Sequence, residues 1–140
     1  MQSQTYFKRF GDDRELEVLQ QILARDPTIT VPVIQITETG FFSELYEPIL
    51  YNTCDIILQK IKLLTRLHKI DVYHNDLGDA NWVIKNGVVK LIDFGSAFLT
   101  VDDEWLQLLY ENILQNDGEV ITTKAEAFQH ELTGFIESFP

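Results

Sequence analysis

Residues 74–95 read HNDLGDANWVIKNGVVKLIDFG, and this stretch decides the predicted fold. Near its centre, Asn86 and Gly87 separate two short runs that are rich in β-branched residues. Asn-Gly is the strongest short hairpin signal, because a type I′ turn requires positive φ at both of its central residues. The stretch therefore predicts a β-hairpin whose two ends, at Asn81 and Asp93, lie side by side.

The segments outside this hairpin predict helices and further short strands. Asp12 and Asp13 suit the N-terminus of a helix that Pro27 should end, because proline disfavours the α conformation of the residue before it. Segregated helices and short hairpins indicate the α+β class, in one domain that covers residues 1–140. The other elements expected from hydrophobic periodicity are helices at about 52–69, 102–114 and 123–138, a strand at Thr5–Arg9, and an antiparallel pair of strands at 30–37 and 41–47.

The helix at 52–69 carries two residues with specific expectations. Its apolar stripe leaves Lys60 off the buried face. Cys54, the only cysteine in the chain, is interpreted as a small buried side chain. A single cysteine excludes an internal disulfide and indicates a reducing compartment, so the expected location is the cytoplasm, that of a host cell if the gene is viral.

Composition excludes several functional classes. The chain has 11 basic and 22 acidic side chains, a net charge of −11, and a hydrophobic fraction of 45%. That hydrophobic fraction is typical of a folded domain and not of a disordered chain. The negative charge argues against general nucleic-acid binding and against docking on anionic lipid, because both require clustered Lys and Arg. No apolar run approaches the roughly 18 residues of a membrane span.

Three polar residues of the 74–95 stretch form a candidate catalytic constellation. Asp76, Asn81 five residues later and Asp93 across the hairpin suit phosphoryl transfer. Asn81 and Asp93 offer two oxygen ligands for Mg²⁺, a hard cation that takes few protein oxygens together with phosphates. Asp76 can then face the γ-phosphate and accept a proton from a hydroxyl group.

The same stretch resembles the catalytic loop and the metal-binding motif of the protein-kinase-like superfamily, H-x-D-L-x-x-x-x-N followed by D-F-G. The resemblance implies a truncated kinase-like fold that uses ATP and Mg²⁺. A partial N-lobe sheet and hinge would cover about 1–47, and a mainly helical C-lobe about 48–140. A surface loop that contains these residues by chance is the alternative interpretation. The seven matching residues are His74, Asp76, Leu77, Asn81, Asp93, Phe94 and Gly95.

Two further segments resemble the family more weakly. Residues 42–48 resemble the hinge whose backbone meets the adenine, so Glu44 and Tyr46 are expected at the nucleotide. Residues 103–111 resemble the buried central helix of the C-lobe, in which Asp103 would support the backbone of the catalytic loop. An ordinary acidic residue at a helix N-terminus is the alternative interpretation of Asp103.

The N-terminal strand resembles the family strand that bears the ATP-binding lysine. Lys8 would bind the α- and β-phosphates and pair with a glutamate of the following helix. Glu15 is preferred over Glu17 as that partner, because the apolar residues of the helix follow Glu15 with helical spacing. An exposed strand lysine and a helix-surface glutamate are the alternative interpretations of this pair.

The chain also departs from the family pattern. Only seven residues precede Lys8 and no G-x-G-x-x-G occurs, so the strands of the phosphate-covering loop are expected to be missing. Asn75 replaces an arginine of many protein kinases, and Gly78 replaces a lysine common in Ser/Thr kinases. The interval between Gly95 and Asp103 is too short for a long activation segment. In this respect the chain resembles small atypical kinases, such as the RIO group and the kinase subunit of the KEOPS complex.

Three functional hypotheses follow. The leading one is a minimal kinase-like phosphotransferase that moves the γ-phosphate of Mg·ATP to a Ser/Thr hydroxyl of a protein. The second is a kinase remnant that binds and inhibits a kinase or its substrate, and its incomplete sheet would leave an edge for a second copy or a partner chain. The third is a small-molecule kinase with a cationic acceptor, of the aminoglycoside or choline type. Acidic side chains near the C-terminus would form its pocket, although a solvated acidic face explains them equally well; they are Glu119, Glu126, Glu131 and Glu137.

Overall fold

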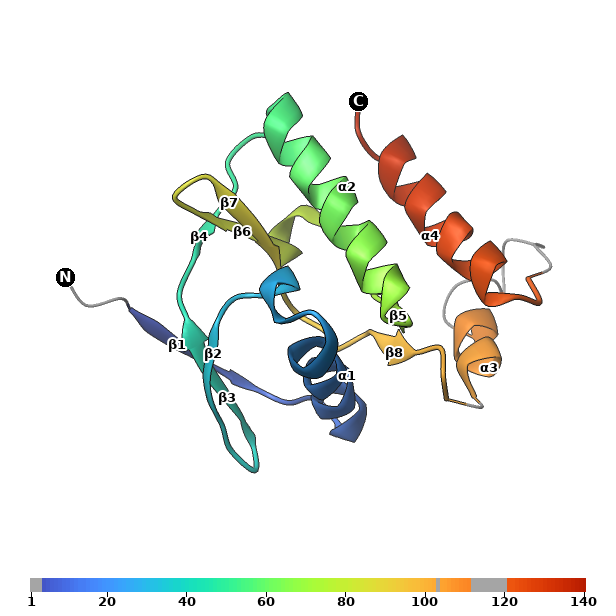
Figure 1. Cartoon of the computed structure of the whole chain (residues 1–140), viewed down its shortest axis with the longest axis horizontal. Coiled ribbons are helices and arrows are strands. Elements are labelled where there is room, and N and C mark those ends of the chain that lie inside the picture. Colours follow the sequence, from blue (N-terminus) through green and yellow to red (C-terminus); the bar gives the residue numbers. More distant parts are fainter. Residues whose placement is uncertain (1–3, 103, 112–120) are drawn as a thin grey trace.

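Short antiparallel sheets and helices follow one another in the computed structural model, which describes residues 4–102, 104–111 and 121–140 (Figure 1). The α+β class predicted from the sequence is confirmed. No helix among the described residues is long and apolar enough to cross a membrane. The strands are β1 (Thr5–Arg9), β2 (Val33–Ile36), β3 (Gly40–Glu44), β4 (Glu47–Pro48), β5 (Val72–Tyr73), β6 (Trp82–Lys85), β7 (Val88–Leu91) and β8 (Phe98–Leu99). The α-helices are α1 (Asp13–Arg25), α2 (Cys54–Lys69), α3 (Trp105–Leu109) and α4 (Lys124–Glu137), and 3₁₀ turns lie at Pro27–Ile29 and Asp79–Asn81.

The first sheet has the strand order β1-β3-β2, with both pairs antiparallel. Lys8 lies opposite Phe41 in this sheet, and Arg9 lies opposite Gly40. A Cβ atom on Gly40 would lie 2.1 Å from the carbonyl oxygen of Lys8, so only glycine allows β1 to approach β3 this closely. After β1 the chain enters α1, whose N-terminus is capped by Asp12 as predicted. This glycine and this cap together determine where Lys8 lies relative to α1.

The predicted hairpin is the pair β6–β7. Asn86 and Gly87 have φ values of 52° and 79°, as a type I′ turn requires. The strand expected at 41–47 is instead divided between two sheets, because the chain leaves β3 after Glu44 and pairs again only at Glu47, opposite Ile84 of β6. The second sheet therefore has the order β4-β6-β7, and the segment between β3 and β4 connects the two sheets.

The core lies where α2 packs against β7, β5 and α4. One continuous cluster of buried side chains includes residues from α1, α2, the hairpin and α4. Thr53 caps the N-terminus of α2, and this helix ends at Lys69 as predicted. The main buried members of the cluster are Val18, Ile22, Ile29, Leu63, Leu64, Leu67, Trp82, Val89, Leu91, Phe94 and Phe135.

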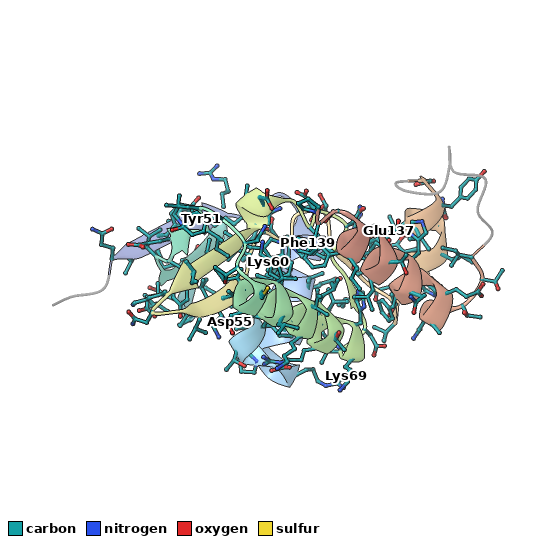
Figure 2. The ribbon with its side chains drawn as sticks, turned by 90° about the horizontal axis from the view of Figure 1, so that it is seen from above. Tyr51, Asp55, Lys60, Lys69, Glu137 and Phe139 are labelled. Atoms are coloured by element: carbon teal, nitrogen blue, oxygen red, sulfur yellow. The ribbon has the colours of Figure 1, made fainter. Side chains whose placement is uncertain are left out.

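Two expectations for α2 are wrong. Lys60 is buried, with 1% of its surface exposed, and its ammonium group is satisfied by donating to Oδ1 of Asn52 at 2.7 Å. The same ammonium lies 5.6 Å from the ring of Trp82 and 5.8 Å from the ring of Phe139, where cation–π attraction compensates part of its lost hydration. Figure 2 shows Lys60 of α2 beside Phe139, which follows α4. Cys54 is exposed, because it is the first residue of the helix.

The C-terminal part contains α3, the pair β5–β8 and α4. The helix expected at 102–114 is shorter in the described residues, where α3 covers only Trp105–Leu109. Asp103 and residues 112–120, including Glu119, lie outside the described residues. The helix expected at 123–138 is α4, with Thr123 as its N-cap.

Candidate functional site

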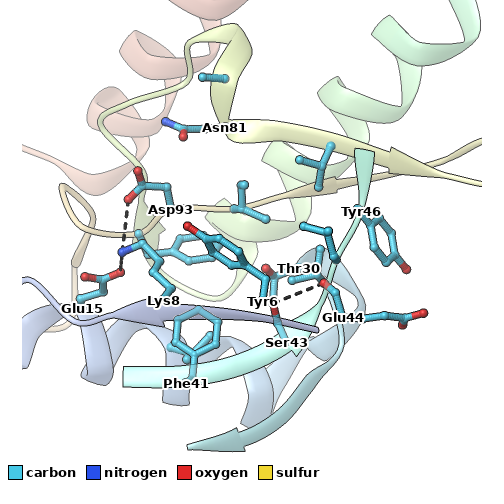
Figure 3. Close-up of a pocket in the computed structure, with 17 residues that line it drawn as sticks. Tyr6, Lys8, Glu15, Thr30, Phe41, Ser43, Glu44, Tyr46, Asn81 and Asp93 are labelled. Atoms are coloured by element: carbon cyan, nitrogen blue, oxygen red, sulfur yellow. Dashed lines mark hydrogen bonds and ion pairs between the residues drawn. The ribbon is translucent and has the colours of Figure 1, made fainter. Parts of the chain in front are cut away.

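A pocket of about 290 Å³ is lined by residues of both three-stranded sheets and of α1 (Figure 3). Six of the seven residues predicted from the sequence as catalytic or ligand-binding lie in its wall. These are Lys8, Glu15, Glu44, Tyr46, Asn81 and Asp93. Apolar side chains form most of the remaining wall: Leu19, Val31, Phe41, Leu45, Val83, Ile92 and Phe94.

Lys8 forms two ion pairs at one end of the pocket. Its Nζ contacts Oε2 of Glu15, and it lies 3.7 Å from Oδ1 of Asp93. Glu15 is only 2% exposed, and its other oxygen accepts the backbone N–H of Gly11 at 2.8 Å. The structure thus brings Lys8 to Glu15, the preferred partner. Because the backbone N–H of Gly11 holds one oxygen of Glu15, the other oxygen can keep the ammonium group of Lys8 at a defined place in the pocket.

Asn81 and Asp93 stand at the two ends of the hairpin, as the sequence predicted. Nδ2 of Asn81 donates to the carbonyl of Asp76 at 2.8 Å, and in Figure 3 its side-chain oxygen lies on the side of Asp93. Asp93 has a φ of 61°, and its Oδ1 accepts the N–H of Gly95 at 3.2 Å. Such a conformation is costly for aspartate and is typical of functional sites.

The side-chain oxygens of Asn81 and Asp93 could hold Mg²⁺ only together with a bound compound that supplies further oxygen atoms. One carboxylate and one amide oxygen are the hard donors that Mg²⁺ accepts, and phosphate oxygens and water would complete its six ligands. Within residues 4–102, 104–111 and 121–140, no three His, Cys, Asp or Glu side chains form a group that could hold a metal. Two protein oxygens would leave the other ligand positions of Mg²⁺ to phosphate oxygens and water.

The opposite end of the pocket lies at the segment between β3 and β4. The carboxylate of Glu44 pairs with Lys85 of β6, and Nζ of Lys85 lies 5.6 Å from the ring of Tyr46. Burial, followed by the negative charge of Glu44, raises the pKa of the Tyr46 hydroxyl, so this group stays neutral. These contacts connect the hairpin to the linking segment and form the end of the pocket away from Lys8.

Asp76 does not line this pocket. It is exposed and lines a second pocket of about 510 Å³, which also includes Asp79 and the aromatic residues Phe135 and Phe139. The carbonyl of Asp76 nevertheless accepts the hydrogen bond from Asn81, a residue of the first pocket. The loop 74–81 therefore separates two pockets and carries polar side chains toward each of them.

His74 holds the backbone of this loop from inside the core. Its Nδ1 accepts the N–H of Asp76 at 3.1 Å, so its Nε2 carries the proton and donates to the carbonyl of Ile92 at 3.1 Å. Burial lowers the pKa of His74, which keeps the imidazole neutral. The side chain therefore connects Asp76 to the strand that leads into Asp93.

Glu131 of α4 supports the loop, a role that the sequence analysis did not assign to it. It is only 7% exposed, not part of a solvated acidic face. Its Oε2 accepts the N–H of Asn75 at 2.7 Å, and its Oε1 accepts the N–H of His74 at 3.2 Å. Nε2 of His68 also lies 2.8 Å from Oε1. Glu131 thus supports the loop backbone, which is the role that the resemblance implied for Asp103.

A signal for Glu131 is present in the sequence. Ala127, Glu131 and Phe135 recur with a spacing of four residues, and all three are buried on one face of α4. A carboxylate in the middle of an apolar stripe indicates a buried partner, because an isolated buried charge is costly.

The site as a whole combines a cation, two carboxylates and an amide oxygen at one end of an apolar pocket. Such an arrangement can bind an anionic group at Lys8 and a metal at Asp93, and can cover a flat apolar group with its remaining walls. A scan against models of protein families finds no match, and a search of curated proteins finds none either. The geometry therefore carries the functional argument.

Proposed function

We propose that this chain is a minimal kinase-like phosphotransferase with a truncated kinase-like fold, using ATP and Mg²⁺. The observation that carries the proposal is the position of Lys8, held between buried Glu15 and Asp93 at the polar end of an apolar pocket. Lys8 would bind phosphate oxygens of the nucleotide. Asn81 and Asp93 would hold Mg²⁺, which neutralises charge on the phosphates as they react.

Asp76 is the proposed base. In the transfer, the acceptor hydroxyl oxygen bonds to the γ-phosphorus, the bond from that phosphorus to the oxygen of ADP breaks, and the hydroxyl proton passes to the Asp76 carboxylate. The exposure of Asp76 toward the second pocket supports an acceptor that approaches from that side. His74 and Glu131 would keep Asp76 in place through the loop backbone.

The leading acceptor is a Ser/Thr hydroxyl of a protein. The second pocket favours one other candidate, a small hydroxyl compound, because it is concave and about 510 Å³ in volume. Asp76 and Asp79 on its rim would suit a compound that carries an amine. Both acceptors use the same nucleotide pocket and the same base.

Nucleotide binding tests the first half of the proposal. At about 100 times its Kd, Mg·ATP should raise the free energy of unfolding by about 2.7 kcal/mol, which is about 10 °C in Tm for a chain of this size. The Asp93→Asn variant should lose the part of this shift that requires Mg²⁺. Asp55→Asn, an exposed aspartate on α2, is the matched control and should keep the full shift. A wild-type Tm that does not change with millimolar Mg·ATP contradicts the proposal.

Phosphate transfer tests the second half. The assay follows the γ-phosphate of labelled ATP into the chain itself, into Ser/Thr peptides and into a panel of amino-alcohols. Asp76→Asn should lower transfer by at least about 100-fold and leave the nucleotide-induced Tm shift unchanged, because Asp76 lies outside the nucleotide pocket. Equal transfer by Asp76→Asn and wild type contradicts the role of Asp76. Binding of Mg·ATP without transfer to any acceptor favours the remnant that acts by binding.

A further inference from the structure

Tyr6 is a residue of the first pocket to which the sequence analysis gave no role. Alternate side chains of a strand share a face, so Tyr6 and Lys8 lie on the same side of β1, about 7 Å apart. Tyr6 pairs with Ser43 of β3, and both line the pocket together with Thr30. In Figure 3 the side chain of Tyr6 rises from β1 between the Lys8 end of the pocket and the end formed by Thr30 and Ser43.

The ring of Tyr6 is incompletely covered by the protein. Tyr6 is 52% exposed, and within the described part of the chain its ring stacks on no other aromatic side chain. Its neighbour Phe7, on the other face of β1, lies 4.8 Å from the ring of Phe42. An aromatic ring in a pocket wall without a partner offers a flat apolar surface that a planar ligand can cover.

The wall contributed by the hairpin completes such a site. Val83 and Ile92 line the pocket from β6 and from the end of β7, whereas Tyr6 lines it from the first sheet. The ion pair of Lys8 and Asp93 lies beyond Tyr6, at one end of the pocket. A ligand that fits the pocket would place a planar apolar group between Tyr6 and the hairpin wall, and an anionic group at Lys8. A nucleotide has this chemistry.

We infer that Tyr6 stacks on the base of the bound nucleotide and is the main aromatic contact that recognises it. This inference rests on the proposed function, because it requires a nucleotide in the first pocket. The ring holds the base against Val83 and Ile92, and Lys8 on the same face of β1 receives the phosphates. Base recognition and phosphate binding are thus carried by two side chains of one strand.

The test compares ligands that do and do not carry a base. Dissociation constants are measured by calorimetry for Mg·ATP and for Mg·tripolyphosphate, which lacks the base and the ribose. Tyr6→Ala should weaken Mg·ATP by about 5- to 150-fold, the range for loss of one base–aromatic stack. Its affinity for Mg·tripolyphosphate should equal that of wild type, a result that general damage to the pocket would not produce.

Two further variants complete the comparison. Tyr6→Phe keeps the ring and should bind Mg·ATP within about twofold of wild type. Tyr51→Ala removes a tyrosine that is 75% exposed and lies outside the pocket wall, so it should bind both ligands like wild type.

The outcomes separate this inference from the proposed function. If wild type binds Mg·ATP and Tyr6→Ala binds it equally or more tightly, stacking by Tyr6 is refuted and the nucleotide site stands. If Tyr6→Ala weakens both ligands equally, the side chain supports the pocket and does not recognise the base, which also overturns the inference. If wild type binds neither ligand, the proposed function fails and the inference fails with it.

Discussion

Replacing Glu131 by alanine removes the acceptor on which the loop before Asp76 depends. Three donors lose their partner: the backbone N–H groups of His74 and Asn75, and Nε2 of His68. The site is nearly closed to solvent, with Glu131 only 7% exposed, so water replaces the carboxylate incompletely. Both the stability of the domain and the position of Asp76 should suffer.

The expected magnitude follows from these three contacts. A hydrogen bond to a charged acceptor contributes about 1.5–3 kcal/mol, and breaking a buried charged network costs about 3–5 kcal/mol. Because the loop also has an exposed side, we expect Glu131→Ala to lower the free energy of unfolding by about 3 kcal/mol, which corresponds to about 10 °C in Tm. Glu131→Gln keeps the shape and one acceptor oxygen, so its loss should be about half as large.

Two assays measure the effect separately. Urea unfolding followed by tryptophan fluorescence, to which buried Trp82 and half-buried Trp105 contribute, reports the free energy of unfolding. Hydrogen exchange reports the two loop amides, which should exchange at least about 100-fold faster in Glu131→Ala. Phosphate transfer, if the proposed function holds, should fall by about 100-fold, because a displacement of about 1 Å at the base is enough for such a loss.

The control is Glu137→Ala, which removes an exposed carboxylate from the same helix and should change stability by less than about 0.5 kcal/mol. Equal urea midpoints for Glu131→Ala and Glu137→Ala would refute the reasoning. Unchanged protection of the amides of His74 and Asn75 would refute it as well, even if the variant were less stable. In that case Glu131 would contribute to the packing of α4 and not to the loop.

Three further predictions concern stability. Burial lowers the pKa of His74 in the folded state below its value of about 6.5 in the unfolded state, so the unfolded state binds more protons as the pH falls below about 6.5. The stability that the neutral imidazole contributes is therefore present above about pH 6.5 and is lost as the pH falls toward the folded pKa. His74→Gln should therefore flatten the decrease of the urea midpoint between about pH 7 and pH 5, and an unchanged slope contradicts this. Lys60→Met should change the free energy of unfolding at neutral pH by less than about 1 kcal/mol, whereas Lys60→Ala should lower it by about 2–3 kcal/mol. The reason is that the packing of the lysine methylene groups contributes more than the buried charge. Equal urea midpoints for the two variants would refute this. Gly40→Ala should cost more than about 2 kcal/mol through its clash with Lys8, whereas Gly134→Ala, in open space within α4, should stabilise by about 0.5–1 kcal/mol; calorimetric Tm values of the opposite order would contradict both.

Local sequence signals predicted the elements whose causes are themselves local. Asn86 and Gly87 determine the hairpin because the turn needs their positive φ, and no distant contact is required. Asp12 determines the start of α1 in the same way, through a hydrogen bond to Glu15 three residues later. The juxtaposition of Asn81 and Asp93 follows directly from the hairpin.

Residues whose environment is made by distant segments could not be predicted in this way. Lys60 was expected on the surface because it lies off the apolar stripe of its helix. Its burial depends on Trp82 and Phe139, which arrive from the hairpin and from the segment after α4. For Glu131 the sequence left a substrate pocket and a solvated face equally open, and the backbone groups that it binds lie 56 and 57 residues away in the chain.

The sequence by itself determined the α+β class, the hairpin, the cap of α1 by Asp12, and the position of Asn81 and Asp93 at the two ends of the hairpin. The resemblance already implied the pair of Lys8 and Glu15. Only the tertiary structure decided that Lys8 also meets Asp93, that Tyr6 stands in the same pocket, and that Glu131 holds the loop. The physical reason is the range of the interactions. Turns and caps are satisfied within a few residues, whereas a buried charge or a pocket wall exists only after segments far apart in the chain have packed together.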